Sequence, residues 1–158
     1  MRSLFAGCAI ALLTTTAAAA RVAAPMRPAA ASVTLSTSRA GVRPVTLTLE
    51  LRYEMQCAHP GPGPLAITFP AAEQLPAQLL AADVLVNGHA ATQVERSGRV
   101  VSVALPIEHG PLCDVIAPAV LKVVFTRGAA LGNPRTAGTY TLTARTPRVS
   151  GGTTMAIH

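Results

Sequence analysis

The stretch that decides the fold is Val45-Thr-Leu-Thr-Leu-Glu-Leu-Arg-Tyr-Glu54. Its odd-numbered positions carry aliphatic or aromatic side chains, and its even-numbered positions carry threonine or charged side chains. Because the side chains of a β-strand alternate between two faces, this pattern predicts a strand with one buried face and one face in water.

Shorter segments with the same period lie on both sides of this stretch. A short strand is expected to begin at Val33, and others are expected over residues 65–69, 84–86, 100–105, 120–125 and 140–144. Asn87-Gly88 favours a tight turn, because both residues tolerate positive φ. Residues 71–82 have a helical composition, but Pro76 interrupts them, so we expect a turn or a short helix there.

Together these segments predict an all-β domain. Seven or eight short strands without intervening helices are typical of a β-sandwich. The strands must pair antiparallel, because a parallel crossover needs a dozen or more residues. The side chains expected in the core are Leu47, Leu49, Leu51, Leu121, Val123, Tyr140 and Leu142.

The composition limits the alternatives. The chain has 158 residues, about one domain, and half of it is hydrophobic, which excludes a disordered chain. Thirteen prolines and 12 glycines, scattered without a period, argue against collagen and against a long helical bundle. The body of the chain holds no apolar run of about 18 residues, so we expect no membrane span after processing.

The N-terminus is typical of a secretory signal peptide. Arg2 supplies a positive charge, residues 4–13 are almost wholly apolar, and Ala18 and Ala20 form a small-residue cleavage site. The apolar run is about half the length that a membrane span requires, so we expect cleavage and a secreted or envelope location. The predicted organisation is a signal peptide (1–20), an Ala/Pro-rich leader (21–31), a sandwich domain (32–147) and a C-terminal tail or edge strand (148–158).

Cys57 and Cys113 are the two cysteines that remain after processing. A pair of cysteines in an exported domain predicts a disulfide bond. Closing the loop from residue 57 to residue 113 would stabilise the fold by about 4 kcal/mol through the entropy of the unfolded chain.

A histidine accompanies each cysteine, in Cys57-Ala-His59 and in His109-Gly-Pro-Leu-Cys113. If the two loops meet, these four side chains form a set that can hold zinc, or copper after reduction. The spacing is not that of a zinc finger, and export favours oxidation of the thiols. The disulfide is therefore the first hypothesis, with no metal or other cofactor, and the Cys57, His59, His109 and Cys113 metal site is the alternative.

Catalytic patterns are missing from the sequence. It has no Gly-x-Ser-x-Gly motif, and its glutamates show no pairing typical of a glycosidase. His109, Cys113 and Asp114 are close in sequence, but a bridged cysteine cannot act as a nucleophile. We expect no enzymatic activity and no catalytic residues.

The charge of the chain raises the question of its partners. The formal net charge is +6 and the pI is about 10.3. The arginines form no run, and two tyrosines and three phenylalanines offer no stacking platform, so we expect no nucleic acid. Anionic envelope polymers, lipid head groups or another protein are the partners that we expect instead.

Three stretches resemble a known family of domains. They are Leu65-Ala-Ile-Thr-Phe-Pro70, Val84-Leu-Val-Asn-Gly88, and Gly132-Asn-Pro134 with Ala137-Gly-Thr-Tyr-Thr-Leu142. In this order they resemble immunoglobulin-like sandwich domains of secreted and cell-surface bacterial proteins, over roughly residues 32–147. The resemblance implies an antiparallel immunoglobulin-like β-sandwich with a surface or structural role, and no catalytic residues.

Two features depart from this family. The chain carries a single copy of the pattern, and it has a Cys/His pair in each of two loops. In the immunoglobulin topology these two loops tend to lie at opposite ends of the sandwich, so a bridge requires a long reach or another strand order. The sequence predicts a secreted or surface-attached, non-catalytic domain with a structural or binding role, and the alternative is a small exported metal-binding protein.

Overall fold

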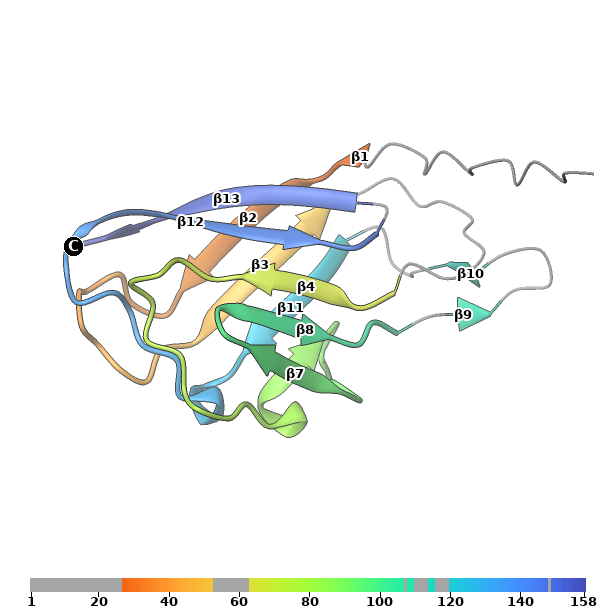
Figure 1. The fold of residues 1–158 in the computed structure, drawn as a ribbon, viewed down its shortest axis with the longest axis horizontal. Helices are drawn as coiled ribbons and strands as arrows, with labels where there is room; N and C mark the ends of the chain where they lie inside the picture. Colours follow the sequence, from red (N-terminus) through yellow and green to blue (C-terminus); the bar gives the residue numbers. More distant parts are fainter. Residues whose placement is uncertain (1–26, 53–62, 107, 110–113, 116–119, 148) are drawn as a thin grey trace, which may run out of the picture.

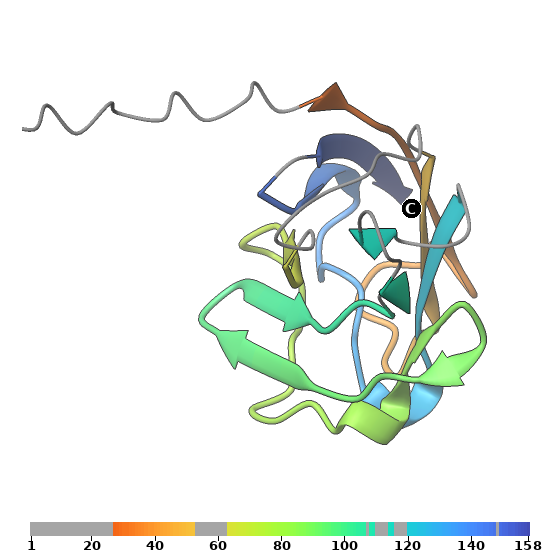
Figure 2. The same cartoon turned by 90° about the vertical axis from the view of Figure 1, so that its right-hand side faces the viewer.

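The structure is a computed structural model, and it describes residues 27–52, 63–106, 108–109, 114–115, 120–147 and 149–158. Within these residues the protein is an all-β sandwich of two sheets (Figures 1 and 2). All neighbouring strands pair antiparallel except β1 and β13, which pair parallel. The predicted all-β, antiparallel β-sandwich is therefore confirmed, although the two sheets hold six and five strands where seven or eight strands in all were expected.

One sheet has six strands and the other has five. The six-stranded sheet has the order β1 (Arg27–Pro28), β13 (Val149–Ile157), β12 (Gly138–Arg145), β4 (Leu65–Thr68), β8 (Val100–Val103) and β7 (Val94–Ser97). The five-stranded sheet has the order β2 (Ala30–Leu35), β3 (Leu47–Arg52), β11 (Val120–Phe125), β5 (Val84–Val86) and β6 (His89–Ala90).

Two further kinds of element complete the described part of the chain. β9 (Glu108–His109) and β10 (Asp114–Val115) form a separate two-stranded hairpin. The 3-10 turns η1 (Ala81–Asp83) and η2 (Arg127–Ala129) lie side by side below the sheets in Figure 1. No helix in the described residues is long and apolar enough to cross a membrane.

The alternation seen in the sequence becomes the two faces of β3. Leu47, Leu49 and Leu51 are buried, whereas the residues between them are half-buried on the outer face. The register pairs these leucines with Phe125, Val123 and Leu121 of β11, so both strands send the same rows inward. Phe125 meets Phe69 edge to face, with ring centroids 5.5 Å apart, in the space between the sheets.

Tyr140 is the exception among the predicted core residues. The other six predicted residues are buried, but Tyr140 is only half-buried. Its hydroxyl donates a hydrogen bond to the carbonyl of Thr136, 2.8 Å away. A phenol that stays near the surface can satisfy its polar end in this way, so the alternation of β12 holds while the ring remains at the rim.

The turns follow the sequence signals. Asn87 and Gly88 both have positive φ, 51° and 88°, and join β5 to β6 as predicted. Residues 71–82 form no α-helix, and only their last two residues enter a 3-10 turn, η1. The sequence predicted a turn or a short helix for this segment, and Pro76 accounts for the absence of a longer helix.

Strands extend beyond both ends of the predicted sandwich domain. Arg27–Pro28 and Ala30–Ala31, within the expected leader, belong to β1 and β2. Residues 149–157, within the expected tail or edge strand, form β13, which pairs with all of β12. Met155 and Ile157 of β13 are buried, so this strand contributes directly to the core.

Candidate functional site

One end of the sandwich, which we name the cysteine end, is formed in the described residues by the end of β3, the starts of β4 and β11, and the segments 104–106 and 146–147. In the sequence, Cys57 falls between β3 and β4, and Cys113 falls between β8 and β11. Cys57, His59 and Cys113 lie outside the described residues, and His109 is described as part of β9, opposite Asp114 of β10. The disulfide and the metal site therefore stay predictions. The described residues hold no group of three or more His, Cys, Asp or Glu side chains that could bind a metal ion.

The strand order corrects one expectation about this pair. Arg52, the last residue of β3, pairs with Val120, the first residue of β11. The segment after β3 and the segment before β11 therefore leave the sandwich at the same end. The immunoglobulin topology predicted opposite ends for the two cysteine loops, whereas the described strand ends that flank them, Arg52 and Val120, are neighbours in one sheet.

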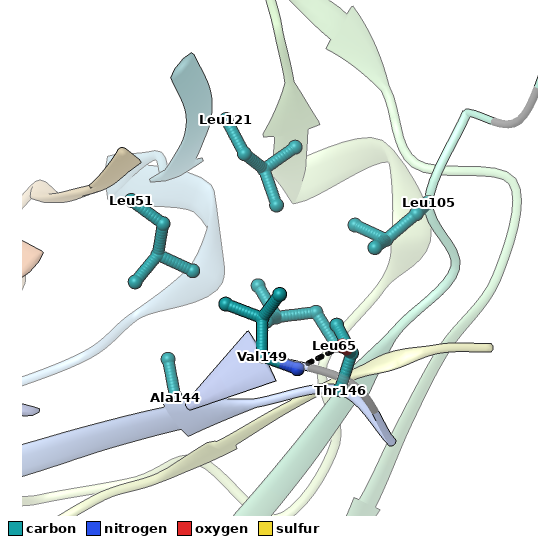
Figure 3. Close-up of a pocket in the computed structure, with 7 residues that line it drawn as sticks. All are labelled: Leu51, Leu65, Leu105, Leu121, Ala144, Thr146 and Val149. Atoms are coloured by element: carbon teal, nitrogen blue, oxygen red, sulfur yellow. Dashed lines mark hydrogen bonds between the residues drawn. The ribbon is translucent and has the colours of Figure 1, made fainter. Parts of the chain in front are cut away.

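An apolar pocket lies between the sheets at the cysteine end (Figure 3). Its enclosed space is about 20 Å³, which is room for one water molecule. Thr146 turns its hydroxyl away from this space, because Oγ1 accepts a hydrogen bond from the backbone N–H of Val149, 3.1 Å away. The lining residues are Leu51, Leu65, Leu105, Leu121, Ala144, Thr146 and Val149. The pocket is a gap in packing and is too small for an organic ligand.

The opposite end, which we name the arginine end, consists of the loops 36–46, 70–83 and 126–137 (left and lower left in Figure 1). Asn133 is fully buried among them. Its Nδ2 donates to the carbonyls of Thr37 and Arg39, at 2.8 and 2.9 Å. Its backbone N–H donates to Val42, and its carbonyl accepts from Gln74 Nε2 at 2.6 Å. One asparagine thus joins all three loops.

Backbone pairs reinforce this junction. Val45 pairs with Leu131, and Gln74 pairs with Gly132, each as an isolated antiparallel bridge. A Cβ at Gly132 would lie 3.0 Å from Cβ of Arg43 and 3.2 Å from Cβ of Gln74. Glycine is therefore what allows the loops to approach so closely.

A buried carboxylic acid lies next to this junction. Glu73 is 2% exposed, and neither of its carboxylate oxygens has a hydrogen-bond partner among the described residues. Burial raises the pKa of Glu73 from 4.5 to about 7, and the positive charge of Arg99 offsets part of that rise. Arg99 Nη2 donates to the carbonyl of Pro70, so this arginine also holds the start of the 70–83 loop.

This cluster offers no recognisable catalytic arrangement in the described residues. A buried neutral acid needs a nucleophile, a metal or a second acid to react, and the groups at hand are amides, carbonyls and arginine. No pattern in the sequence indicates that Glu73 or Asn133 is buried, because single polar residues in loops are normally exposed. The neighbouring prolines, in Asn133-Pro134 and Gln74-Leu75-Pro76, indicate only that both residues lie in turns or loops.

Comparison with known proteins bears on the fold. No family model matches the chain, and no curated protein matches it. Among solved structures it is similar to BslA, whose structure is described as that of a bacterial hydrophobin. The TM-score is 0.54 with 19% identity, and the match covers 83% of this chain and 97% of that chain. At this identity the likeness concerns the arrangement of the strands, and it supports the sandwich.

Proposed function

We propose that this chain is an exported, non-catalytic β-sandwich with a structural or binding role at the cell envelope. The observation that carries the proposal is the sandwich itself, whose strands continue to residue 157 and follow an N-terminal segment with the order of a signal peptide. The similarity to a bacterial hydrophobin is compatible with this role.

An immunoglobulin-like architecture fits the end of the chain. β12 and β13 are the last two strands and lie side by side in one sheet. Tyr140 stands near the start of β12, and its hydroxyl reaches back four residues to the carbonyl of Thr136. This arrangement resembles the tyrosine corner, which in immunoglobulin domains ties the start of the penultimate strand to the preceding loop. It supports the family resemblance without naming a ligand.

A second role within the same class is assembly at an interface, by analogy with the bacterial hydrophobin. The described surface gives it little support. Leu80 is the only large hydrophobic side chain exposed in the described residues, at 63%. An interfacial protein needs a contiguous apolar patch, so we place the structural or binding role first.

Cell fractionation with N-terminal sequencing tests the proposal. The mature protein is expected in the envelope or the medium, beginning at Arg21 or within the following dozen residues. A matched control replaces Ala18 and Ala20 with arginine, which removes the small residues that the signal peptidase needs and should block processing. Recovery of the intact chain from Met1 in the cytosol contradicts the proposal.

A surface-tension measurement on the purified mature protein distinguishes the interfacial role. We expect a slow, modest fall typical of an ordinary globular protein. A rapid fall with an elastic film would instead place the interfacial role first, and the apolar residues responsible would then have to lie outside the described part of the chain.

A further inference from the structure

Four exposed arginines belong to the arginine end. Arg39 and Arg43 lie in the 36–46 loop, and Arg127 and Arg135 lie in the 126–137 loop. Neither loop contains an aspartate or a glutamate. Their positive charge is therefore not balanced within the loops that carry it.

The fold holds these two loops against each other. Asn133 Nδ2 donates a hydrogen bond to the carbonyl of Arg39. Asn133 itself lies two residues before Arg135 in the 126–137 loop. The N–H of Gly41 donates to the carbonyl of Pro134 at 2.8 Å. Arg43 packs over Gly132, and its Nε donates to the carbonyl of Ala130 at 2.9 Å. Hydrogen bonds between the two loops thus fix the backbone around Arg39, Arg43 and Arg135, which reduces the entropy lost when a ligand binds.

Two acidic side chains lie near this surface. Glu73 is buried beneath the loops, and the carboxylate of Asp83 occupies the space that a Cβ at Gly128 would need. No carboxylate of the described residues forms a salt bridge with any of the four arginines, whereas Lys122 on the five-stranded sheet pairs with Glu50 at 3.4 Å. The guanidinium groups of Arg39, Arg127 and Arg135 remain available to an external anion, whereas Arg43 already uses its Nε in the bond to Ala130.

We propose that the arginine end binds a linear, phosphate-bearing polymer of the envelope. The proposal rests on the proposed function, since it names the partner of that envelope domain. Guanidinium groups match phosphate oxygens in a bidentate geometry, and several on one rigid surface can engage successive phosphates of a chain. Such binding is driven by counterion release and weakens steeply with salt.

Two other anionic partners fit this surface less well. A lipid bilayer favours a basic patch with several apolar or aromatic side chains that insert, and Leu80 is the single large apolar side chain exposed in the described residues. Single-stranded nucleic acid favours stacking on several aromatic side chains, and in the described residues Phe69 and Phe125 are buried and only Tyr140 is half-buried. A polymer recognised through its phosphates requires neither feature.

The test measures binding of fluorescently labelled, long-chain inorganic polyphosphate to the mature protein as a function of salt. The double variant Arg39→Gln/Arg135→Gln should bind roughly tenfold more weakly and should reduce the salt slope by about two, the number of lost phosphate contacts. The matched control Arg52→Gln/Arg145→Gln removes the same charge from exposed strand positions and should change affinity less than about twofold. Unfolding curves of both variants verify that the fold is intact.

Several outcomes overturn the proposal. Equal losses in the two double variants would show that net charge alone attracts the polymer. Absence of polyphosphate binding at low salt would also refute it. Tighter binding to phosphatidylglycerol vesicles than to polyphosphate, abolished by Leu80→Ser, would assign the surface to a membrane. An exported protein that fails to bind polyphosphate refutes this inference and leaves the proposed function standing, whereas a cytosolic protein that binds polyphosphate refutes the proposed function and with it the envelope as the source of the polymer.

Discussion

The two ends of the sandwich are built by different means. At the arginine end, three loops meet around buried Asn133 and are joined by two backbone bridges, Val45 to Leu131 and Gln74 to Gly132. At the cysteine end, the described strand termini surround a small apolar gap lined mainly by leucine, alanine and valine. Hydrogen bonds between loops therefore hold the arginine end together, whereas the described residues of the cysteine end are held together by apolar contacts between the two sheets.

This difference has energetic consequences. A buried hydrogen bond contributes about 1 kcal/mol net, but an orphaned buried partner costs about 1–3 kcal/mol, so the arginine end tolerates few substitutions. The stability of the cysteine end depends on the apolar area that its side chains bury. A disulfide between Cys57 and Cys113 would add stability by reducing the entropy of the unfolded chain. Substitutions at matched positions of the two ends measure the contrast.

The largest expected effect comes from leucines at the two ends. Leu131 is fully buried and forms one of the two backbone bridges of the arginine end, and Leu131→Ala should cost about 4–5 kcal/mol, the upper part of the range for leucine truncation. Leu105 is 8% exposed and already borders the gap, so Leu105→Ala should cost about 2 kcal/mol. Urea unfolding of both variants gives the two free energies. Equal costs would show that the two ends are packed alike.

The disulfide gives the next effect. If Cys57 and Cys113 are bridged, the mature protein has no free thiol without reductant, and replacing both cysteines with serine lowers the free energy of unfolding by about 4 kcal/mol. His59→Ala and His109→Ala serve as controls and should leave stability unchanged. Two titratable thiols with about one equivalent of bound metal would instead support the metal site of Cys57, His59, His109 and Cys113.

The strands could be predicted from the sequence, because their signal is local. Alternation in Val45–Glu54 sets which face of β3 is buried, and Asn87-Gly88 sets a hairpin, without reference to distant residues. The partner of each strand could not be predicted in the same way. The end of β3 and the start of β11 lie at one end of the sandwich because the two strands are neighbours, and this pairing depends on the order of all the strands.

The polar cluster of the arginine end could not be predicted, since its bonds span the chain. Asn133 and Thr37 are 96 residues apart, and Gln74 and Asn133 are 59 apart. In the sequence, Asn133-Pro134 indicates only a loop. An asparagine in a turn and an asparagine that joins three loops look the same until tertiary contacts are known.

Glu73 gives a pH-dependent difference at the arginine end. Its folded pKa, about 7, is raised above its ordinary value of 4.5, so its contribution to stability is fully present below pH 4.5 and is lost as the pH rises to 7. The loss should reach about 3 kcal/mol above pH 7. Glu73→Gln stays neutral, so it should match the parent protein at pH 4 and exceed its stability at pH 8. Urea unfolding across this pH range measures the difference, and parallel curves for the two proteins would refute the assignment.

The smallest expected effect concerns the hydroxyl of Tyr140, which ties the 126–137 loop to β12 through the carbonyl of Thr136. Tyr140→Phe keeps the ring against Gly138 and removes only this hydrogen bond, so it should cost about 1 kcal/mol. The carbonyl that loses its partner can bind water because the site is half-buried, which limits the cost. Tyr140→Leu, which also removes ring contacts, should cost more. If Tyr140→Phe is neutral while Tyr140→Leu is not, the ring alone holds the loop, and the likeness to a tyrosine corner has no energetic basis.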